Sequence, residues 1–379
     1  MPELSCQREK FEIPNGITYL NAAYMGPLSR ASIAAGIAGL ERKVRPWEVT
    51  APDFFEPVEE VRTLIAELID ADRDGVALLP SVSYGIAVAA QNLPFATGSR
   101  IVVLAEEFPS NYYAWRELAS RESGDLVTVQ RPAGGDWTSA TLERIDERTS
   151  IVAVANCHWT DGGLLDLVRI GQRAREVGAA LVVDGTQSIG AMPFDVAAVQ
   201  PDFLVCAAYK WMLGPYSSAF VWCAPAHRSG RPLEFSWMTR KGSDDFPHLV
   251  EYQDEYRPGA RRYDVGETSN FALLPVLRSA LSQTLEWGIE NIASYIAALG
   301  DRTAQAAESI GLGVAARHLR APHLIGVRLG GADPGVVAKA MAEAGIYVSV
   351  RGDAVRVAPH VYNDADDVDR LFEVLRSTL

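Results

Sequence analysis

The sequence predicts an α/β protein: a mostly parallel, seven-stranded sheet with helices on both faces, followed by a smaller α+β domain at the C-terminal end. From residue 75 onward, short apolar runs rich in β-branched residues alternate with stretches of helical period. The runs are continuously apolar instead of alternating with polar residues. That pattern is typical of strands buried on both faces of a parallel sheet.

Seven apolar runs account for the predicted sheet. They span residues 76–79, 101–104, 126–129, 151–154, 180–183, 203–206 and 218–223. The segments between them space their apolar residues as helices do, and they would cross from one parallel strand to the next. The last run follows residue 210 after a link too short for a helical crossover, so we expect that strand to be antiparallel.

The C-terminal third has a different pattern. A polar stretch with Pro and Gly spans residues 228–258, and the apolar spacing after it predicts one long helix through 277–296. The rest predicts a strand at 324–329, a helix at 334–344, strands at 347–350 and 355–358, and a last helix capped by Asp364. We therefore predict a large domain at 16–258 and a small domain at 259–379, to which residues 1–15 would belong.

Composition narrows the classes of function. Hydrophobic residues make up 48% and charged residues 22% of the 379, as in ordinary globular proteins. The net charge of -13 argues against binding to nucleic acid or to an anionic membrane surface, which need a basic footprint. No apolar run approaches the length of a transmembrane helix, so we expect a soluble, cytoplasmic protein. The four cysteines form no C-x-x-C motif, which indicates neither a metal site nor a disulfide framework.

Two charged residues close to the ends of predicted strands carry the first chemical signal. Asp184 ends the run LVVD, and Lys210 ends FLVCAAYK in a chain with only five lysines. Ligands of such sheets bind at the carboxyl ends of the strands. An amine and a carboxylate placed there suit pyridoxal phosphate (PLP), which needs a lysine for its Schiff base and an anion beside its pyridine nitrogen. A structural ion pair at the rim of the sheet is the alternative.

A phosphate group would need backbone donors at the start of a helix. The segment 80–85 lies between the first strand and the next helical stretch, so its free amides and the Ser83 hydroxyl could face an anion. Ser81 or Ser83 could equally be an ordinary helix cap.

Six blocks together resemble the class V aminotransferases, a family of fold-type I PLP enzymes that also holds cysteine desulfurases, kynureninases and isopenicillin N epimerase-like proteins. The blocks are YLNAA at 19–23, EFPSN at 107–111, VDGTQSIG at 183–190, YK at 209–210, RYDVGE at 262–267 and RVAPHVYN at 356–363. They occur in the family's order over nearly the whole chain. The resemblance favours the cofactor interpretation of Asp184 and Lys210 over the structural ion pair.

The resemblance implies a role for each matching residue. Lys210 would carry the Schiff base, Asp184 would pair with the pyridine nitrogen, and Gln187 would donate toward the phenolic oxygen. Phe108 would stack on the ring, and the phosphate would be held by Val82, Ser83 and Tyr209. Arg356 would bind the α-carboxylate of the substrate. Asn21, Ala23 and His158 are further candidates for substrate binding. The order of the chain leaves open which of His158, Trp159 and Thr160 faces the cofactor. Trp237 and Thr268 lie in regions that reach the neighbouring subunit's phosphate in relatives, so we expect a homodimer with the site at the subunit interface.

Residues that differ from those of the relatives reduce the number of reactions to consider. The segment 351–355 before Arg356 has no cysteine, whereas desulfurases carry their nucleophilic thiol there, so we expect no persulfide chemistry. Phe108 replaces the ring-stacking histidine of desulfurases and cannot transfer a proton. Epimerisation would therefore need another base, and His158 is the one nearby histidine that the sequence suggests.

The predicted function is that of a PLP-dependent enzyme acting at Cα of a small-molecule amino acid, with transamination favoured. A C–S lyase or β-eliminase and an amino-acid epimerase are the alternatives, because the fold does not choose among them. A non-catalytic PLP-fold binding protein is an alternative of another class, which the complete set of Lys, Asp, Gln and Arg argues against. A dinucleotide-binding protein is excluded because no G-x-G-x-x-G follows the first strand.

Overall fold

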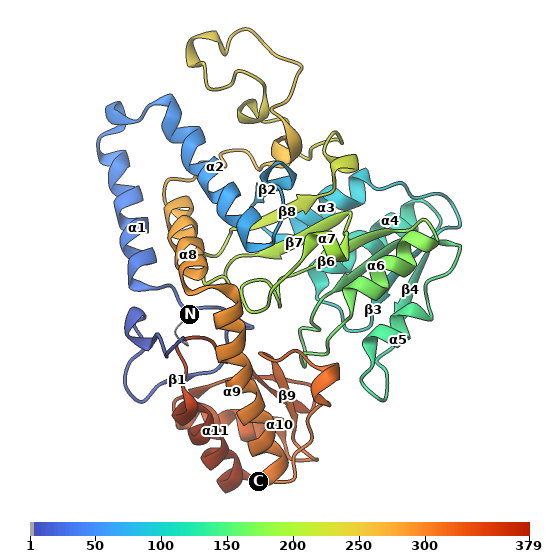
Figure 1. Cartoon of the computed structure of the whole chain (residues 1–379), viewed down its shortest axis with the longest axis vertical. Helices are drawn as coiled ribbons and strands as arrows, with labels where there is room; N and C mark the ends of the chain where they lie inside the picture. The colour runs from blue at the N-terminus through green and yellow to red at the C-terminus, as the bar shows by residue number, and fades with distance from the viewer. Residues whose placement is uncertain (1–3) are drawn as a thin grey trace.

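A seven-stranded sheet forms the centre of the large α/β part in the computed structural model, which describes residues 4–379 (Figure 1). Its strands are β2 (Val76–Leu79), β3 (Arg100–Leu104), β4 (Asp125–Val129), β5 (Thr149–Ala155), β6 (Ala180–Asp184), β7 (Phe203–Ala207) and β8 (Ala219–Cys223), in the order β2-β8-β7-β6-β5-β3-β4. β8 runs antiparallel to both of its neighbours and every other neighbouring pair is parallel. The predicted sheet, including its antiparallel strand, is confirmed.

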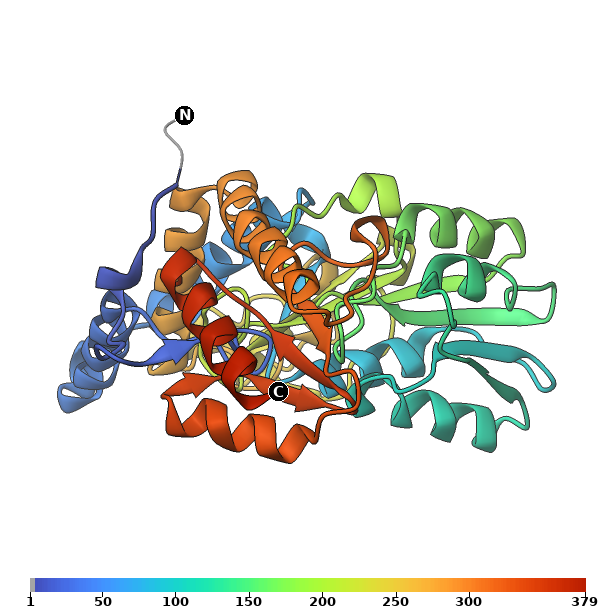
Figure 2. The ribbon, with the colours of Figure 1, turned by 90° about the horizontal axis from the view of Figure 1, so that it is seen from below.

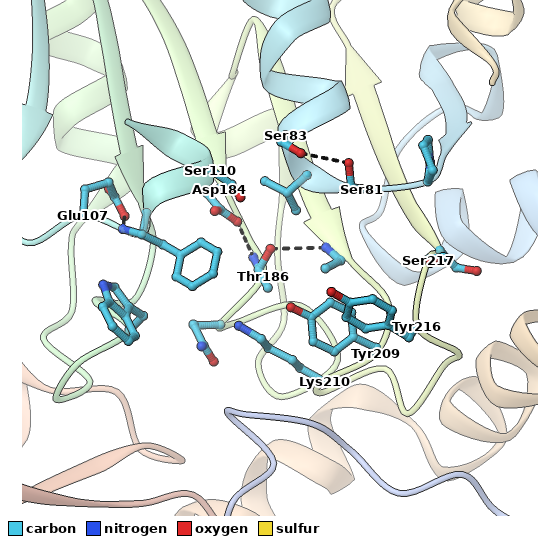
Figure 3. Close-up of a pocket in the computed structure, with 18 of the residues that line it drawn as sticks. Ser81, Ser83, Glu107, Ser110, Asp184, Thr186, Tyr209, Lys210, Tyr216 and Ser217 are labelled. Atoms are coloured by element: carbon cyan, nitrogen blue, oxygen red, sulfur yellow. Dashed lines mark hydrogen bonds between the residues drawn. The ribbon is translucent and has the colours of Figure 1, made fainter. Parts of the chain in front are cut away.

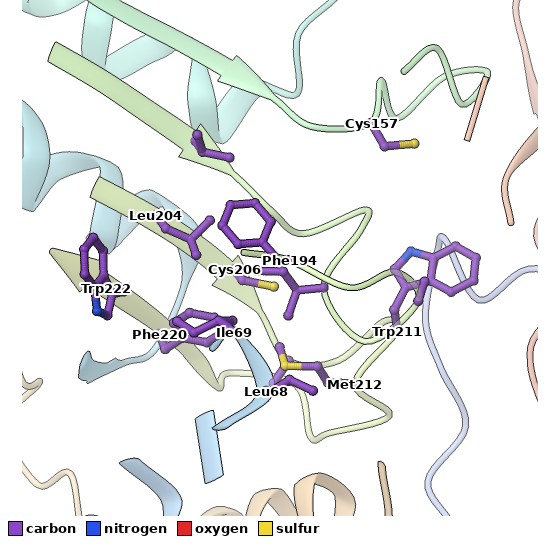
Figure 4. Packing of buried hydrophobic residues seen from close by; sticks show 14 of the residues in the cluster. Leu68, Ile69, Cys157, Phe194, Leu204, Cys206, Trp211, Met212, Phe220 and Trp222 are labelled. Atoms are coloured by element: carbon purple, nitrogen blue, oxygen red, sulfur yellow. The ribbon is translucent and has the colours of Figure 1, made fainter. Parts of the chain in front are cut away.

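Both faces of the sheet are covered by helices. Along β5, Val152 and Val154 belong to one buried apolar cluster, whereas Ile151 and Ala153 belong to the other. The helices of the first face are α2 (Ala51–Leu68), α6 (Leu167–Glu176), α7 (Val196–Val199) and α8 (Leu273–Trp287), and those of the second are α3 (Val82–Asn92) and α4 (Tyr113–Arg121). Figure 4 shows part of the first cluster, in which Phe194, Cys206 and Phe220 pack together. This double burial is why the strand sequences are continuously apolar.

Two helices before the first strand of the sheet extend the large part. α1 (Arg30–Glu41) and α2 pack against α8, and all three lie side by side in Figure 1. α2 begins with a capping box in which Thr50 and Asp53 satisfy each other's backbone N–H groups. A short helix, α5 (Trp137–Leu142), lies between β4 and β5.

The predicted single helix through 277–296 is wrong, because two helices occupy that region. α8 ends at Trp287 and α9 (Ile289–Ser309) begins two residues later. Gly288 between them has a φ of 79°, a left-handed conformation that interrupts the helix and that glycine adopts without strain. The apolar spacing continues through the break, so periodicity alone did not reveal it.

The C-terminal part holds two small sheets. β9 (Ile325–Arg328), β11 (Ser349–Arg351) and β12 (Ala354–Val357) form an antiparallel sheet, while β10 (Ile346–Tyr347) pairs with β1 (Thr18–Tyr19), flanked by α10 (Pro334–Glu343) and α11 (Ala365–Thr378). The predicted strand 347–350 is thus divided between two sheets. Asp364 caps α11, as predicted.

The N-terminal segment reaches the C-terminal part through β1, as the view from below shows (Figure 2). Leu20 lies in the apolar cluster of the C-terminal part, with Leu299, Val355 and Leu371. The domain boundary at 258/259 stays a prediction. Within residues 4–379, no helix combines the length and the apolar character needed to cross a membrane.

Candidate active site

A cavity of about 270 Å³ opens at the carboxyl ends of the central strands, beside the start of α3 (Figure 3). Lys210 follows β7, Asp184 ends β6, and Cys157 follows β5. The carboxyl ends of parallel strands meet at one edge of a sheet, so residues distant in sequence come together there. Of the predicted cofactor-binding residues, the cavity is lined by Val82, Ser83, Phe108, Asp184, Gln187, Tyr209 and Lys210.

Lys210 is buried, with 5% of its surface exposed, and its amine faces an aromatic ring. Its Nζ lies 5.2 Å from the centre of the Phe108 ring. Burial lowers the pKa of Lys210 to about 8, although the nearby Asp184 carboxylate opposes this shift. The amine is therefore close to half neutral at mildly alkaline pH, which is the state a nucleophile or a base requires.

The N-terminal segment closes over the lysine. The Gly26 N–H donates to the carbonyl of Tyr209 (2.8 Å), and a Cβ on Gly26 would lie 2.3 Å from the carbonyl oxygen of Lys210. Only glycine permits this approach, which holds the backbone of Lys210 in place.

Asp184 is buried and forms no ion pair within 4 Å in residues 4–379, although the Lys210 amine is close enough to act on its charge. Its Oδ1 accepts a hydrogen bond from the Thr186 N–H (2.9 Å), yet burial raises the pKa of this carboxyl above its ordinary value. A protonated pyridine nitrogen would supply the missing positive charge. The residues present therefore fit PLP at this position.

Glu107 is a buried carboxyl in the same cavity, and our assignment of roles from the sequence omitted it. Its Oε1 accepts the Phe108 N–H (2.8 Å), and within the described chain its Oε2 has no hydrogen-bond partner. Burial, together with the charge of Asp184, raises the pKa of Glu107 to about 8. Its place directly before Phe108 in the block 107–111 was the signal that could have identified it.

The structure at the start of α3 shows which of Ser81 and Ser83 caps the helix, a point that the sequence left open. Ser81 is the helix cap, since its Oγ accepts the Tyr84 N–H (3.2 Å). The hydroxyl of Ser83 forms a hydrogen bond with that of Ser81 (3.0 Å) and lines the cavity. The first N–H groups of an α-helix have no acceptor within the helix, so those of Val82 and Ser83 can receive an anion.

Gln187 is fixed by two protein contacts. Its Nε2 donates to the carbonyl of Ala23 (3.0 Å), and its Oε1 accepts from Trp211 Nε1 (2.8 Å). One hydrogen of the amide nitrogen stays available for a ligand in the cavity. Ala23 itself lines the outer part of the site.

Arg356, on β12, lines an adjoining cavity of about 330 Å³ that shares Phe108, Trp159, Tyr209, Lys210 and Tyr216 with the first. Its Nη1 donates to the carbonyl of Trp159 (2.6 Å) and its Nη2 approaches the Ser349 hydroxyl (3.4 Å). Ser349 in turn donates to Asn21 Oδ1 (2.9 Å). Asn21 therefore positions the arginine through Ser349 and does not line either cavity.

His158 lies outside both cavities, so its predicted place in the substrate site is corrected. Its ring stacks on Trp137 at 4.7 Å, its Nε2 donates to the carbonyl of Ala105 (3.1 Å), and its Nδ1 forms a hydrogen bond with the Thr160 hydroxyl (2.7 Å). Burial lowers the pKa of His158, which keeps the imidazole neutral. Among residues 158–160, Trp159 is the one that faces the site.

Trp237 and Thr268 likewise do not line their own chain's cavity. Trp237 is 42% exposed and packs against Phe54 and Phe55. Thr268 lines a separate pocket beside Gly266, where its hydroxyl bonds to the carbonyl of Val265. The pocket of Thr268 adjoins the first cavity, with which it shares Pro80, Ser217 and Ser218.

Comparison with known proteins identifies the family. The profile described as "Aminotransferase class-V" matches residues 44–371. This chain belongs to the class V aminotransferase family. It is a PLP-dependent enzyme, as the resemblance of its sequence blocks implied.

Relatives within the family differ in their activities. The chain is 27% identical to the "uncharacterized aminotransferase YcbU" of Bacillus subtilis, over 92% of this chain and 89% of that one. It is 23% identical to the isopenicillin N epimerase of Streptomyces clavuligerus, over 65% and 64% of the two chains. A probable cysteine desulfurase of Methanothermobacter thermautotrophicus is 34% identical, over only 44% and 42%.

Solved structures share the fold over the whole chain. The cysteine desulfurase of Thermococcus onnurineus matches with a TM-score of 0.85 at 19% identity, covering 100% of this chain and 99% of that one. A lysine-to-alanine variant of C-DES, with glycine covalently linked to its PLP, matches with a TM-score of 0.89 at 18% identity, covering 98% and 100%. These likenesses confirm the fold-type I architecture.

Proposed function

We propose that this enzyme is an aminotransferase, which moves the amino group of an amino acid to a 2-oxo acid. The observation that carries the proposal is that the Lys210 amine and the Phe108 ring face each other in the cavity. The Lys210 amine enters the cavity opposite the Phe108 ring, which cannot hold a proton. One base that removes a proton and returns it on the same side suits transamination.

The cofactor would be held by residues already gathered in the cavity. When bound, PLP supplies an aldehyde that condenses with amines and a ring that withdraws electrons from the substrate Cα. Val82 and Ser83 would donate to its phosphate at the start of α3, together with the hydroxyl of Tyr209. Asp184 would keep its ring nitrogen protonated, and Phe108 would cover one ring face.

Lys210 performs the proton transfers in this proposal. With a pKa of about 8, its amine can take a proton from Cα at neutral to alkaline pH and can release it again without a large energetic cost. Arg356, which has no carboxylate partner in the described chain, would bind the substrate carboxylate and so orient the Cα–H bond toward Lys210.

Two alternative reactions lack a group that they need. Epimerisation through two bases would require a second base beside Phe108. His158 is not there, and the Glu107 carboxyl that lies there accepts the Phe108 N–H. Persulfide formation would require a mobile thiolate, whereas Cys157 is fully buried and its burial raises the pKa of the thiol. The nearly full-length similarity to a Bacillus protein named as an uncharacterized aminotransferase is consistent with transamination.

We also propose a homodimer whose interface completes each site. An apolar stripe on α1 and the turn after it is exposed to solvent: Ile33, Ile37, Leu40, Val44 and Trp47 are 40–76% exposed. Exposed apolar patches of this kind mark protein interfaces. A second copy seated on this face would bury it, and the positions of Trp237 and Thr268 away from their own cavity are consistent with a role in the neighbouring one.

The test of transamination uses the holoenzyme with a set of amino acids, each with and without a 2-oxo acid acceptor. Transamination conserves the amino group, so one new amino acid should form for each 2-oxo acid produced, with no ammonia. Release of ammonia without an acceptor would instead establish β-elimination and would overturn the proposal. Lys210→Ala is the control for uncatalysed exchange.

A further inference from the structure

The adjoining cavity of about 330 Å³, which Arg356 and Lys210 line, is cationic although the net charge of the chain is -13. Its walls carry three basic groups, Lys210, Arg351 and Arg356, and no acidic side chain. Its other lining residues are aromatic or apolar. Such a cavity attracts anions, and it has one more guanidinium than an α-carboxylate requires.

Buried arginines elsewhere in residues 4–379 are paired with carboxylates. Arg62 bonds to both oxygens of Asp264, Arg261 contacts Glu59 and Asp74, and Arg320 contacts Asp301. Arg356 is the exception: it is 1% exposed, and within residues 4–379 it has no ion pair and its Nε has no hydrogen-bond partner. A buried charge without a partner is costly, which indicates that a ligand completes the site.

Arg351 shares this lack of a partner within the described chain. Its Nη1 donates to the carbonyl of Val350 (2.7 Å). Its Nε is buried without a hydrogen bond, and no carboxylate of residues 4–379 lies within ion-pair distance of it. By contrast Arg131, which also donates to the Thr160 hydroxyl, binds both Glu106 and Asp161. The guanidinium of Arg351 is therefore as available to a ligand as that of Arg356.

The guanidinium groups of Arg351 and Arg356 contact different parts of Trp159. Arg356 donates to its backbone carbonyl, whereas Arg351 lies over its indole ring, with Cζ 5.4 Å from the ring centre. The repulsion between them is one reason, after burial, why the pKa of Arg356 falls to about 10. Arg351 ends β11 and Arg356 lies on the paired strand β12, so the hairpin fixes their spacing.

We propose that Arg351 binds a second carboxylate, on the side chain of the substrate, and that this enzyme acts on an acidic amino acid and its 2-oxo acid. The inference rests on the proposed function for its chemistry, because Arg356 is taken to bind the α-carboxylate. Arg351 is then the residue that determines substrate specificity. A side-chain carboxylate is also a poor leaving group, which is consistent with transamination and not with elimination.

The kinetic test compares substrates of equal size that differ in charge. L-aspartate and L-glutamate are assayed against L-asparagine and L-glutamine, with wild-type holoenzyme and with Arg351→Gln. We expect wild type to prefer at least one acidic substrate, and Arg351→Gln to lower kcat/KM for it about 10- to 100-fold, mainly through KM, with amide substrates little changed. Arg351→Lys should restore part of the preference.

Arg328→Gln is the matched control, because Arg328 is an exposed arginine on β9 of the same small sheet and lies outside both cavities. It should leave the preference unchanged. An equal loss for acidic and amide substrates in Arg351→Gln would overturn the proposal, since Arg351 would then serve the α-carboxylate or the fold. A wild-type preference for neutral substrates would overturn it as well.

A binding measurement separates this inference from the proposed reaction. Glutarate and butyrate differ by one carboxylate and cannot react, and their binding to the holoenzyme can be followed by tryptophan fluorescence because Trp159 lies between the arginines. We expect glutarate to bind at least about tenfold more tightly than butyrate in wild type and not in Arg351→Gln. If glutarate binds more tightly in this way but no amino group is transferred, the proposed transamination is wrong and the role of Arg351 stands. Transamination with equal binding of the two acids would overturn the role of Arg351 alone.

Discussion

Asp184 and Lys210 reach one cavity from neighbouring parallel strands. Asp184 is the last residue of β6, where it pairs with Val205 of β7, and Lys210 lies just beyond the end of β7. Burial lowers the pKa of the amine and raises that of the carboxyl, whereas their mutual attraction opposes both shifts. Asp184 would therefore regain its charge if PLP supplied a cationic ring nitrogen, and burial would keep the Lys210 amine largely neutral at alkaline pH.

Lys210 should be the covalent anchor of PLP. Borohydride reduction of the holoenzyme should fix the cofactor on the peptide that contains Lys210, and Lys210→Ala should lower turnover on the order of a thousandfold or more while the fold is kept. Mass spectrometry of the reduced, digested protein and circular dichroism of the variant check the two parts. Label on the exposed Lys241 or Lys339 would contradict the assignment.

Lys210 should also make the apoprotein's stability depend on pH. Its pKa of about 8 in the folded protein lies below the ordinary value of 10.5, so the unfolded chain binds more protons between those values and stability rises with pH across that window. At pH 7 the buried ammonium costs roughly 3 kcal/mol. Apoprotein with Lys210→Met should therefore be more stable than wild type at pH 7, and the difference should shrink toward pH 10.5.

Urea unfolding at several pH values measures this difference. Lys339→Met is a suitable control, because Lys339 is exposed and should show no such trend. If the stability difference between Lys210→Met and wild type were the same at every pH, burial would not lower the pKa of the Lys210 amine.

Asp184 should be required for turnover and not for the fold. Asp184→Asn keeps the shape but cannot hold a proton on the pyridine nitrogen, so we expect kcat to fall by about a hundredfold or more, the size of effect seen when an electrostatic stabiliser is removed. Asp184→Glu should retain more activity than Asp184→Asn. Near-normal kcat in Asp184→Asn would rule out the proposed role of the carboxylate.

Cys157 should be chemically inert although it borders the cavity. Burial raises the pKa of its thiol, and at 0% exposure it cannot move toward a substrate. Wild-type enzyme given L-cysteine should form no protein persulfide, and Cys157→Ala should keep kcat within about twofold. A persulfide in wild type that disappears in Cys157→Ala would place this enzyme among the desulfurases instead.

Thr268 should act in the neighbouring subunit's site. The Lys210→Ala homodimer and the Thr268→Val homodimer should each have low activity. Mixing the two after mild dissociation should restore part of the activity. In each hybrid dimer, one of the two sites then combines a native Lys210 with a native Thr268 from the other subunit. Light scattering of the mixture confirms the dimer. If activity does not recover although hybrids form, Thr268 serves its own chain or has only a structural role.

The sequence by itself determined the sheet and the principal pair of charged residues. Short continuous apolar runs that alternate with helical stretches are typical of strands buried on both faces of a parallel sheet. The carboxyl ends of such strands meet at one edge of the sheet, so Asp184 and Lys210 could be predicted to lie at the same edge. The sequence also placed Ser81 and Ser83 at the start of a helix, but only the structure identified Ser81 as its cap.

Tertiary structure alone decided what depends on side-chain direction and on contacts between distant segments. Which of His158, Trp159 and Thr160 enters the site depends on how the chain turns after β5, and stacking on Trp137 holds the histidine away. Arg351 reaches the cavity because a hairpin of the C-terminal part folds back toward the sheet, and no spacing in the sequence records that contact. Periodicity measures burial along one helix or strand, whereas the direction of a side chain into a shared cavity is set by every element that packs around it.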